Sequence, residues 1–206
     1  AAYDAGLRSV AIVFMHGYRF AQHEQAAARL ARAAGFTQVS TSHATSPLMK
    51  FVSRGDTTVV DAYLSPILRR YVEQIAADMP GVRLLFMQSS GGLTDAHCFQ
   101  GKDAVLSGPA GGIVGMARTA ELAGHDRVIG FDMGGTSTDM ALILDGRSTV
   151  TNSAAVGDFP LTMPVTGIEA VGAGGGSIAW MDGSVLRVGP RSAGAWPGPA
   201  CFGRGG

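Results

Sequence analysis

Charged residues are scarce in this sequence, and neither sign is in excess. The chain has 206 residues, of which 16 are Lys or Arg and 16 are Asp or Glu, so its formal net charge is zero. A nucleic-acid-binding protein usually shows a basic excess or a clustered basic face. The sequence shows neither, and we therefore expect no nucleic-acid partner.

Long apolar runs and cysteine pairs are also missing. No apolar stretch reaches the roughly 18 residues that a membrane-spanning helix needs, and residues 1–10 lack the basic and apolar regions of a signal peptide. The two cysteines, Cys98 and Cys201, form no C-x-x-C pair, so the sequence supports neither a disulfide framework nor a zinc site. We expect a cytoplasmic protein without a membrane partner.

Glycine, in contrast, is abundant and clustered. The chain contains 30 glycines, and such clusters indicate places where the backbone approaches another group closely. The composition, with 46% hydrophobic residues, is typical of an α/β protein with a buried core. Because the chain begins without Met and ends in C-F-G-R-G-G, we expect it to be an internal piece of a longer protein.

The first half of the sequence predicts a βαβ unit. A strand over residues 10–15, a helix over residues 22–34 that ends at Gly35, and a strand over residues 36–40 follow one another. Strands connected in this way are parallel and the crossover is right-handed.

A second, longer helical pattern covers residues 57–77. Pro66 lies inside it, so either the helix kinks there or Ser65 caps a second helix that begins with Pro66. Before the pattern, Arg54-Gly55-Asp56 is interpreted as a solvated turn. After it, residues 83–88 predict a buried strand, whose end at residues 88–92 is a candidate for substrate or interdomain contact.

The second half is rich in predicted β-hairpins. Strands over residues 127–133 and 139–144 flank a Gly-Gly turn, and strands over residues 178–181 and 185–188 flank Asp182-Gly183. Between the two halves, S-G-P-A-G-G-I opens a helix that ends at Gly124. We place the domain boundary there, with residues 1–124 as the βαβ half and residues 125–206 as the hairpin-rich half.

The residues D-M-G-G-T-S-T-D, from Asp132 to Asp139, have the composition of a phosphate-binding turn. Backbone N–H groups at Gly134 and Gly135 can approach a phosphate without obstruction by Cβ atoms. Three consecutive hydroxyl residues can donate further hydrogen bonds: Thr136, Ser137 and Thr138. The alternative is an ordinary tight turn in which the glycines and hydroxyls only satisfy the backbone.

The two carboxylates of Asp132 and Asp139 decide between these interpretations. They would repel a bare phosphate, so their presence indicates Mg²⁺ or its waters between protein and nucleotide. The turn is neither a Walker A loop, since no G-K-[ST] occurs, nor a G-x-G-x-x-G turn, since a strand follows it. We therefore predict a Mg-nucleotide site.

The string V-I-G-F-D-M-G-G-T-S-T-D resembles the second acidic Gly-Gly-Thr signature of the hydantoinase A/5-oxoprolinase/acetone carboxylase β-subunit family. Further blocks resemble the family in the same order: F-M-H-G-Y, D-A-Y-L-S-P, Q-S-S-G-G-L, L-S-G-P-A-G-G, V-G-A-G-G-G-S and S-A-G-A-W-P-G-P-A-C-F-G. The resemblance covers essentially the whole chain. Family members are longer and carry an earlier D-x-G-G-T-x-T-D loop, which this chain lacks.

The resemblance implies part of an actin/sugar-kinase/Hsp70-like nucleotide-binding fold, an α/β fold that binds ATP and Mg²⁺. By this carry-over, residues 134–138 hold the phosphates, and Asp132 and Asp139 are the catalytic and metal-binding residues that place Mg²⁺ or the attacking water. Three glycines resemble a turn that lies against adenosine: Gly174, Gly175 and Gly176. The alternative for them is a helix or strand entry that needs positive φ.

The function implied by the resemblance is ATP-dependent opening of a cyclic amide, such as a hydantoin or 5-oxoproline, together with a hydantoinase B-type subunit or domain. One alternative is the ATP-handling subunit of a ketone carboxylase. Another is a non-catalytic nucleotide-binding or docking module, and for the isolated chain we expect little ATPase activity.

The pair His23-Glu24, together with His16, could form a metal pair or a general base. Side chains of this kind more often serve as hydrogen-bond partners in loops and at helix starts. We favour the latter interpretation.

Overall fold

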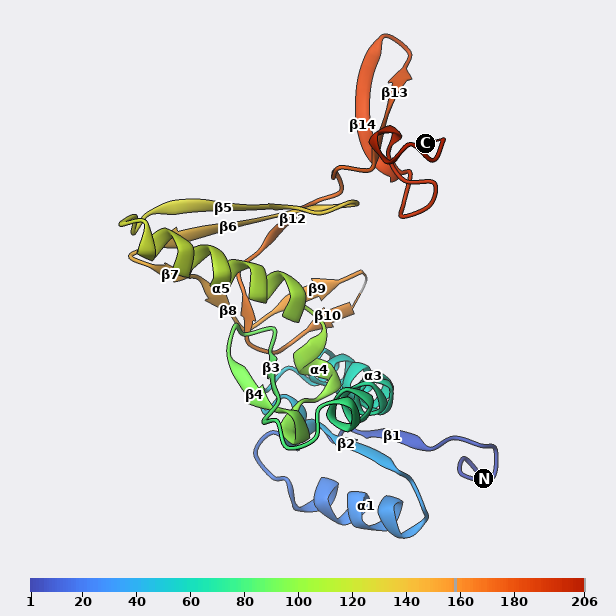
Figure 1. The fold of residues 1–206 in the computed structure, drawn as a ribbon. Coiled ribbons are helices and arrows are strands. Elements are labelled where there is room, and N and C mark those ends of the chain that lie inside the picture. The colour runs from blue at the N-terminus through green and yellow to red at the C-terminus, as the bar shows by residue number, and fades with distance from the viewer. Residues whose placement is uncertain (158, 206) are drawn as a thin grey trace. The chain divides into compact units, whose positions relative to one another are not determined.

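The computed structural model describes residues 1–157 and 159–205, which form helices and several small β-sheets (Figure 1). They fall into two compact units. The first consists of Ala1–Gly111 and the described residues of Val150–Thr166, and the second of Gly112–Thr149 and residues 167–205. This division differs from the boundary expected at Gly124, because helix α5 (Ser107–Leu122) lies mostly in the second unit and a later segment returns to the first.

The first unit begins with the expected βαβ arrangement. Strand β1 (Ser9–Ile12) runs parallel to β2 (Gln38–Thr41), with helix α1 (Gln22–Ala33) between them in the chain. The helix ends where Gly35 adopts a φ of +99°, which favours glycine. The βαβ prediction is confirmed, although β1 is shorter than expected. A single helical turn, α2 (Ser42–Thr45), follows β2.

Helix α3 (Phe51–Asp78) is one continuous helix of 28 residues that passes through Pro66. Of the two alternatives at Pro66, the second helix that begins at this residue is therefore wrong. Proline leaves the carbonyl four residues earlier without its helical donor; here that carbonyl, Ala62 O, accepts a hydrogen bond from Ser9 Oγ instead. The interpretation of Arg54 as part of a solvated turn is also wrong, because the residue lies within α3 and is fully buried.

Short hairpins complete the first unit. Strand β3 (Leu85–Met87) pairs antiparallel with β4 (Leu93–Asp95), and residues 88–92 form the turn between them. These residues therefore do not lie at the carboxyl edge of a parallel sheet, and the strand is only partly buried. The remaining elements are η1 (Ala96–Cys98), α4 (Gly101–Ala104), β8 (Val150–Thr151) with β11 (Val165–Thr166), and β9 (Ala154–Val156) with β10 (Phe159–Leu161).

The second unit is built on an antiparallel sheet in the order β12-β6-β5. Its strands are β5 (Val128–Met133), β6 (Thr138–Leu144) and β12 (Glu169–Val171), with the short β7 (Arg147–Ser148) paired to β6. Helix α5 lies against β5 so closely that a Cβ added at Gly130 would be 2.5 Å from the sulfur of Met116. The helix ends as predicted, with Gly124 at a φ of +80°.

The chain continues into a long hairpin of β13 (Ser177–Asp182) and β14 (Val185–Ser192), followed by η2 (Ala200–Phe202). Gly183 in its turn has a φ of +61°, as the Asp-Gly pair predicts. Both hairpins expected in the second half are therefore confirmed.

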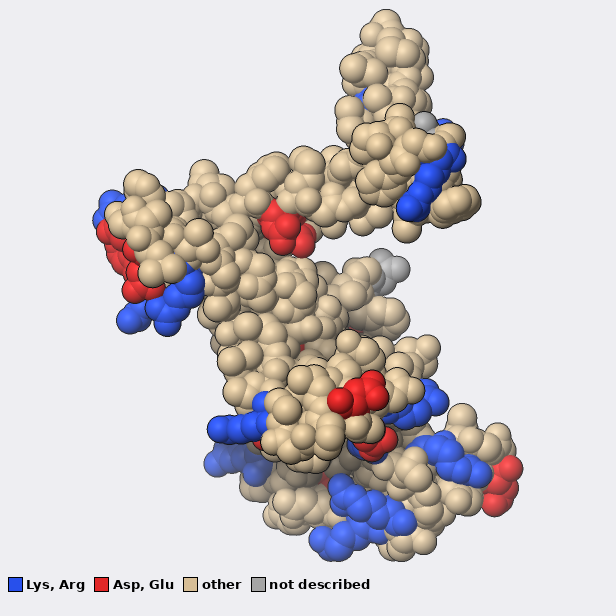
Figure 2. All heavy atoms as spheres, viewed as in Figure 1, with Lys and Arg blue, Asp and Glu red and all other residues tan. Residues whose placement is uncertain are grey.

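Charged side chains are sparse on the face shown in Figure 2, where they form small, separate groups. This distribution agrees with the low charged fraction of 16%. Across residues 1–157 and 159–205, no helix is both long and apolar enough to cross a membrane.

Candidate phosphate-binding site

Two carboxylates face each other across the hairpin of β5 and β6. Asp132 lies directly opposite Asp139 in the antiparallel register, so both side chains are on the same face of the sheet. Among the described residues, neither carboxylate has a hydrogen bond or an ion pair. Like charges placed in this way destabilise a sheet, and a cation between them would remove the penalty.

The protein alone offers such a cation few ligands. Within the part of the chain that the structure describes, no group of three or more His, Cys, Asp or Glu side chains could hold a metal ion. Mg²⁺ commonly binds through one or two carboxylates and completes its shell with phosphate oxygens and water. Two carboxylates beside an anion-binding turn fit a Mg-nucleotide better than a permanent metal.

The turn between β5 and β6, residues 134–138, presents free backbone donors. The N–H of Gly134 donates to Ser137 O at 2.9 Å and closes the turn. The next three N–H groups, of Gly135, Thr136 and Ser137, donate to no group among the described residues, and neither do the hydroxyls of Thr136 and Ser137. Successive free N–H groups in a turn are typical of an anion-binding concavity.

Thr138 has a different environment from its neighbours. Its side chain is buried, with 4% of its surface exposed, and its hydroxyl donates to Ala173 O at 2.6 Å. The hydroxyl is therefore engaged inside the protein. Contact of Thr138 with a phosphate stays a prediction. Its hydrogen bond to Ala173 O links β6 to the segment before Gly174.

The two predicted glycine motifs come together in the structure. The N–H of Gly175 donates to Gly134 O at 2.9 Å, and the N–H of Gly176 donates to Gly135 O at 2.7 Å. A Cβ at Gly174 would lie 2.7 Å from Gly134 O and 2.8 Å from the nitrogen of Thr136.

Close packing therefore explains why side chains are excluded at Gly174 and Gly176. The alternative of a positive φ is wrong for residues 172–177, because none of their glycines has one. The contact of residues 174–176 with adenosine stays a prediction.

Helix α5 approaches the same site. A Cβ added at Gly112 would be 2.9 Å from Oδ2 of Asp132, so the absence of a side chain in the helix leaves room for this carboxylate. This contact gives the S-G-P-A-G-G sequence a packing role next to the acidic pair.

In the first unit, Glu24 is fully buried and accepts several hydrogen bonds. Its donors are the backbone N–H of Phe14 at 2.8 Å, the backbone N–H of His43 at 2.9 Å and the hydroxyl of Ser42, and His43 Nδ1 lies 2.7 Å from Oε2. Burial by itself would raise the pKa of Glu24, but the hydrogen bonds from Ser42, His43 and Phe14 together lower it. The interpretation of Glu24 as a hydrogen-bond partner is confirmed.

Arg54 is the buried residue that the sequence interpretation missed. Its Nε donates to Ser42 Oγ at 2.9 Å. The rest of the guanidinium donates to the backbone carbonyls of two loops, through Phe14, Met15, Leu48 and Met49. No local sequence pattern predicts this role. Leu48 and Met49 lie in the loop just before α3, but Ser42, Phe14 and Met15 are more distant in the chain.

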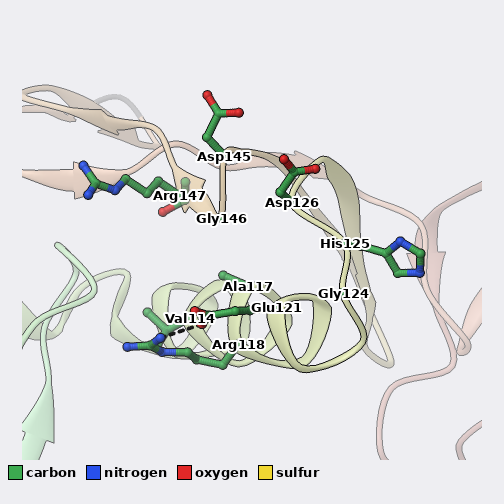
Figure 3. A pocket seen from close by; sticks show the side chains of 11 residues that line it. Val114, Ala117, Arg118, Glu121, Gly124, His125, Asp126, Asp145, Gly146 and Arg147 are labelled. Carbon is green, nitrogen blue, oxygen red and sulfur yellow. Dashed lines mark hydrogen bonds and ion pairs between the residues drawn. The ribbon is translucent and has the colours of Figure 1, made fainter.

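A separate cavity of about 890 Å³ lies in the second unit, between the C-terminal half of α5 and the turn from β6 to β7. Figure 3 shows the ion pair of Arg118 and Glu121 on the helix and the carboxylates of Asp126 and Asp145 directed away from it. None of the predicted site residues lines this cavity. With its charged groups paired or turned outward, it does not present a convergent set of ligand contacts.

Comparisons with known proteins show which proteins the chain is similar to. The family model described as hydantoinase/oxoprolinase matches residues 54–206. The chain is 46% identical to 5-oxoprolinase PfmaA of Pestalotiopsis fici over 98% of its own length and 16% of that protein. It is 42% identical to 5-oxoprolinase of Saccharomyces cerevisiae, over 99% of this chain and 16% of that protein. The chain thus spans about a sixth of the length of these relatives.

Solved structures also resemble this chain. The crystal structure of ATP-dependent caprolactamase from Pseudomonas jessenii superposes with a TM-score of 0.80 and 39% identity, covering 100% of this chain and 31% of that one. Nucleotide-free acetone carboxylase superposes with a TM-score of 0.75 and 26% identity, covering 93% of this chain and 29% of that one. By family model, sequence identity and structure, the chain belongs to the hydantoinase/oxoprolinase family.

Proposed function

We propose that this chain forms a phosphate-binding part of an ATP-dependent enzyme that hydrolyses a cyclic amide of the hydantoin or 5-oxoproline type. The observation that carries the proposal is the turn at residues 134–138, where three successive N–H groups are free beside the opposed carboxylates of Asp132 and Asp139. Relatives named 5-oxoprolinase, at 46% and 42% identity, support the substrate class.

For the fold, we propose part of an actin-like ATPase domain. Two features support it: the antiparallel strands β5 and β6 around an acidic glycine turn, and the likeness to a caprolactamase described as ATP-dependent. For Gly174, Gly175 and Gly176, the predicted contact with adenosine is the alternative to their packing against the phosphate turn.

The chain's own residues have distinct parts in the proposed site. The N–H groups of Gly135, Thr136 and Ser137 hold phosphate oxygens without reorganising, because the turn already orients them. Asp132 and Asp139 would hold Mg²⁺ through their carboxylates or place the attacking water. Bound ATP supplies a phosphoryl group that makes the otherwise unreactive amide carbonyl open to attack.

We further propose a partner that contributes to the substrate site. A relative at 40% identity is the alpha subunit of a caprolactamase from Pseudomonas jessenii, and its designation as a subunit supports a second component. For the present protein we expect a hydantoinase B-type subunit or domain.

The ketone carboxylase alternative rests on the likeness to acetone carboxylase. That structure is 26% identical to the chain, against 39% for the caprolactamase. The higher identity favours cyclic amide hydrolysis, although both activities would use the same phosphate contacts.

The proposal is tested by the ATP turnover of the intact protein with its partner. Phosphate release is measured with 5-oxoproline, hydantoin or caprolactam, and separately with acetone and bicarbonate. We expect one lactam to stimulate phosphate release at least about tenfold, with ring-opened product formed in proportion. Asp132→Asn should abolish the stimulation, whereas Asp126→Asn, at an exposed carboxylate before β5, should preserve it. Stimulation by acetone alone would contradict the amide assignment, and stimulation that survives Asp132→Asn would contradict the site.

A further inference from the structure

We infer that residues 172–177, called here the glycine brace, orient the peptide groups of the phosphate turn, and that Thr138 is a positioning residue which holds the brace in place. This inference rests on the proposed phosphate-binding function of residues 134–138. It assigns the brace an effect on phosphate affinity through the protein backbone.

The argument starts from the planar trans peptide group, in which the C=O and the N–H point in opposite directions. Gly134 O accepts from the N–H of Gly175 at 2.9 Å, and Gly135 O accepts from the N–H of Gly176 at 2.7 Å. Both carbonyls are therefore directed at the brace. The N–H groups in the same peptide units belong to Gly135 and Thr136, and they are directed away from it.

Both of these N–H groups lack a partner among the described residues, as does the N–H of Ser137. If either peptide group rotated, it would present a carbonyl oxygen to the phosphate, and the interaction would change from attraction to repulsion. Glycine-rich turns rotate easily. The two brace hydrogen bonds therefore fix the one orientation in which the turn attracts an anion.

The brace lies in direct contact with the turn. A Cβ at Gly174 would be 2.8 Å from Gly135 C and from Thr136 N, and a Cβ at Gly176 would be 2.9 Å from Gly135 O. Contacts this short with backbone cannot be relieved by rotating a side chain. Any side chain at these two positions would push the brace away from the turn and weaken the hydrogen bonds that orient it.

Two side chains hold the brace itself. Thr138, the first residue of β6, donates from Oγ1 to Ala173 O at 2.6 Å. At the other end, Ser177 Oγ accepts from the N–H of Gly174 at 2.8 Å. Thr138 thus links the strand that follows the phosphate turn to the first residues of the brace.

The test uses the intact protein and two probes, MgATP and adenosine, with dissociation constants measured by calorimetry. The variants are Gly174→Ala, Thr138→Val and Thr138→Ser. The matched control is Gly115→Ala in α5, where an added Cβ meets no atom within 4 Å. Thermal unfolding of each variant shows that it is folded.

Gly174→Ala and Thr138→Val should weaken MgATP binding roughly 10- to 100-fold, the range expected for one charge-assisted hydrogen bond. Adenosine binding should stay within about twofold of the original, because the brace acts on the phosphate contacts. Thr138→Ser keeps the hydroxyl and should restore MgATP affinity. If Gly174→Ala does not fold, the comparison of Thr138→Val with Thr138→Ser decides alone.

Equal losses for adenosine and MgATP would overturn the inference, because they would indicate that residues 174–176 contact the nucleoside. Unchanged MgATP binding in a folded Gly174→Ala or Thr138→Val variant would also overturn it. Asp132→Asn separates these results from failure of the proposed function. If that variant loses MgATP affinity while the brace variants keep it, the site stands and the brace does not.

Discussion

Asp132 and Asp139 are direct cross-strand neighbours, one at each side of a turn in which three successive N–H groups have no partner among the described residues. The pair is unfavourable for the protein alone and favourable only when a cation lies between the carboxylates. Residues that reduce stability without ligand and bind it when present are typical of functional sites.

The first prediction concerns the stability of the chain without nucleotide or metal. Asp139→Asn removes the repulsion from Asp132, so it should raise the free energy of unfolding by roughly 0.2–1 kcal/mol. Urea denaturation measures the gain, which should shrink at high salt because salt screens the charges. A clear loss of stability at low salt would show that the two carboxylates do not repel each other.

The second prediction concerns Gly112 in α5. Alanine there should stabilise the helix by about 1 kcal/mol through propensity, yet its Cβ would lie 2.9 Å from Oδ2 of Asp132 and displace the carboxylate. MgATP affinity should therefore fall, while Gly115→Ala, with open space around it, gains the same helix stability and keeps its affinity. Equal affinities in the two variants would argue against a role for the position of Asp132.

The third prediction uses the lowered pKa of Glu24. Because the folded state lowers this pKa, the unfolded chain binds the proton more readily. The stabilisation is complete above the unfolded pKa of about 4.3 and is lost as the pH falls through the lower folded value.

Glu24→Gln should therefore destabilise the chain strongly near neutral pH and much less at about pH 3. Urea denaturation at both pH values measures the difference, with the exposed Glu73→Gln as the control. The same loss at both pH values would contradict the account of the Glu24 carboxylate.

The fourth prediction concerns Arg54, which is fully buried. Lysine keeps the charge but cannot reproduce the planar set of donors that reaches Ser42 and four loop carbonyls. Arg54→Lys should cost roughly 3 kcal/mol or more, as expected when a buried charged network is broken. Arg70→Lys, at an exposed position of the same helix, should change the free energy of unfolding little. Equal losses of stability in the two variants would show that the hydrogen bonds of Arg54 do not stabilise the fold.

Features that depend on local chemistry could be predicted from the sequence. The turn between β5 and β6, the end of α5 at Gly124 and the hairpin at Gly183 are all determined by residues within a few positions. The pairing of Asp132 with Asp139 follows from the same local register. For these elements, turn chemistry and strand pattern were sufficient.

Features that depend on distant contacts could not be predicted. Continuation of α3 through Pro66 relies on Ser9, which is far away in the chain and satisfies the freed carbonyl. The burial of Arg54 relies on loops from two other segments. The contact of Gly174 with the phosphate turn likewise joins residues about 40 positions apart, and no local pattern specifies it.

The central claim is that the turn at residues 134–138 binds the phosphates of a Mg-nucleotide. Calorimetric titration of the intact protein with ATP, with and without Mg²⁺, tests it most directly. We predict binding that requires Mg²⁺, weakens at least about tenfold in Asp139→Asn and is unchanged in Asp126→Asn. Full affinity in Asp139→Asn, or equal affinity with and without Mg²⁺, would contradict the claim.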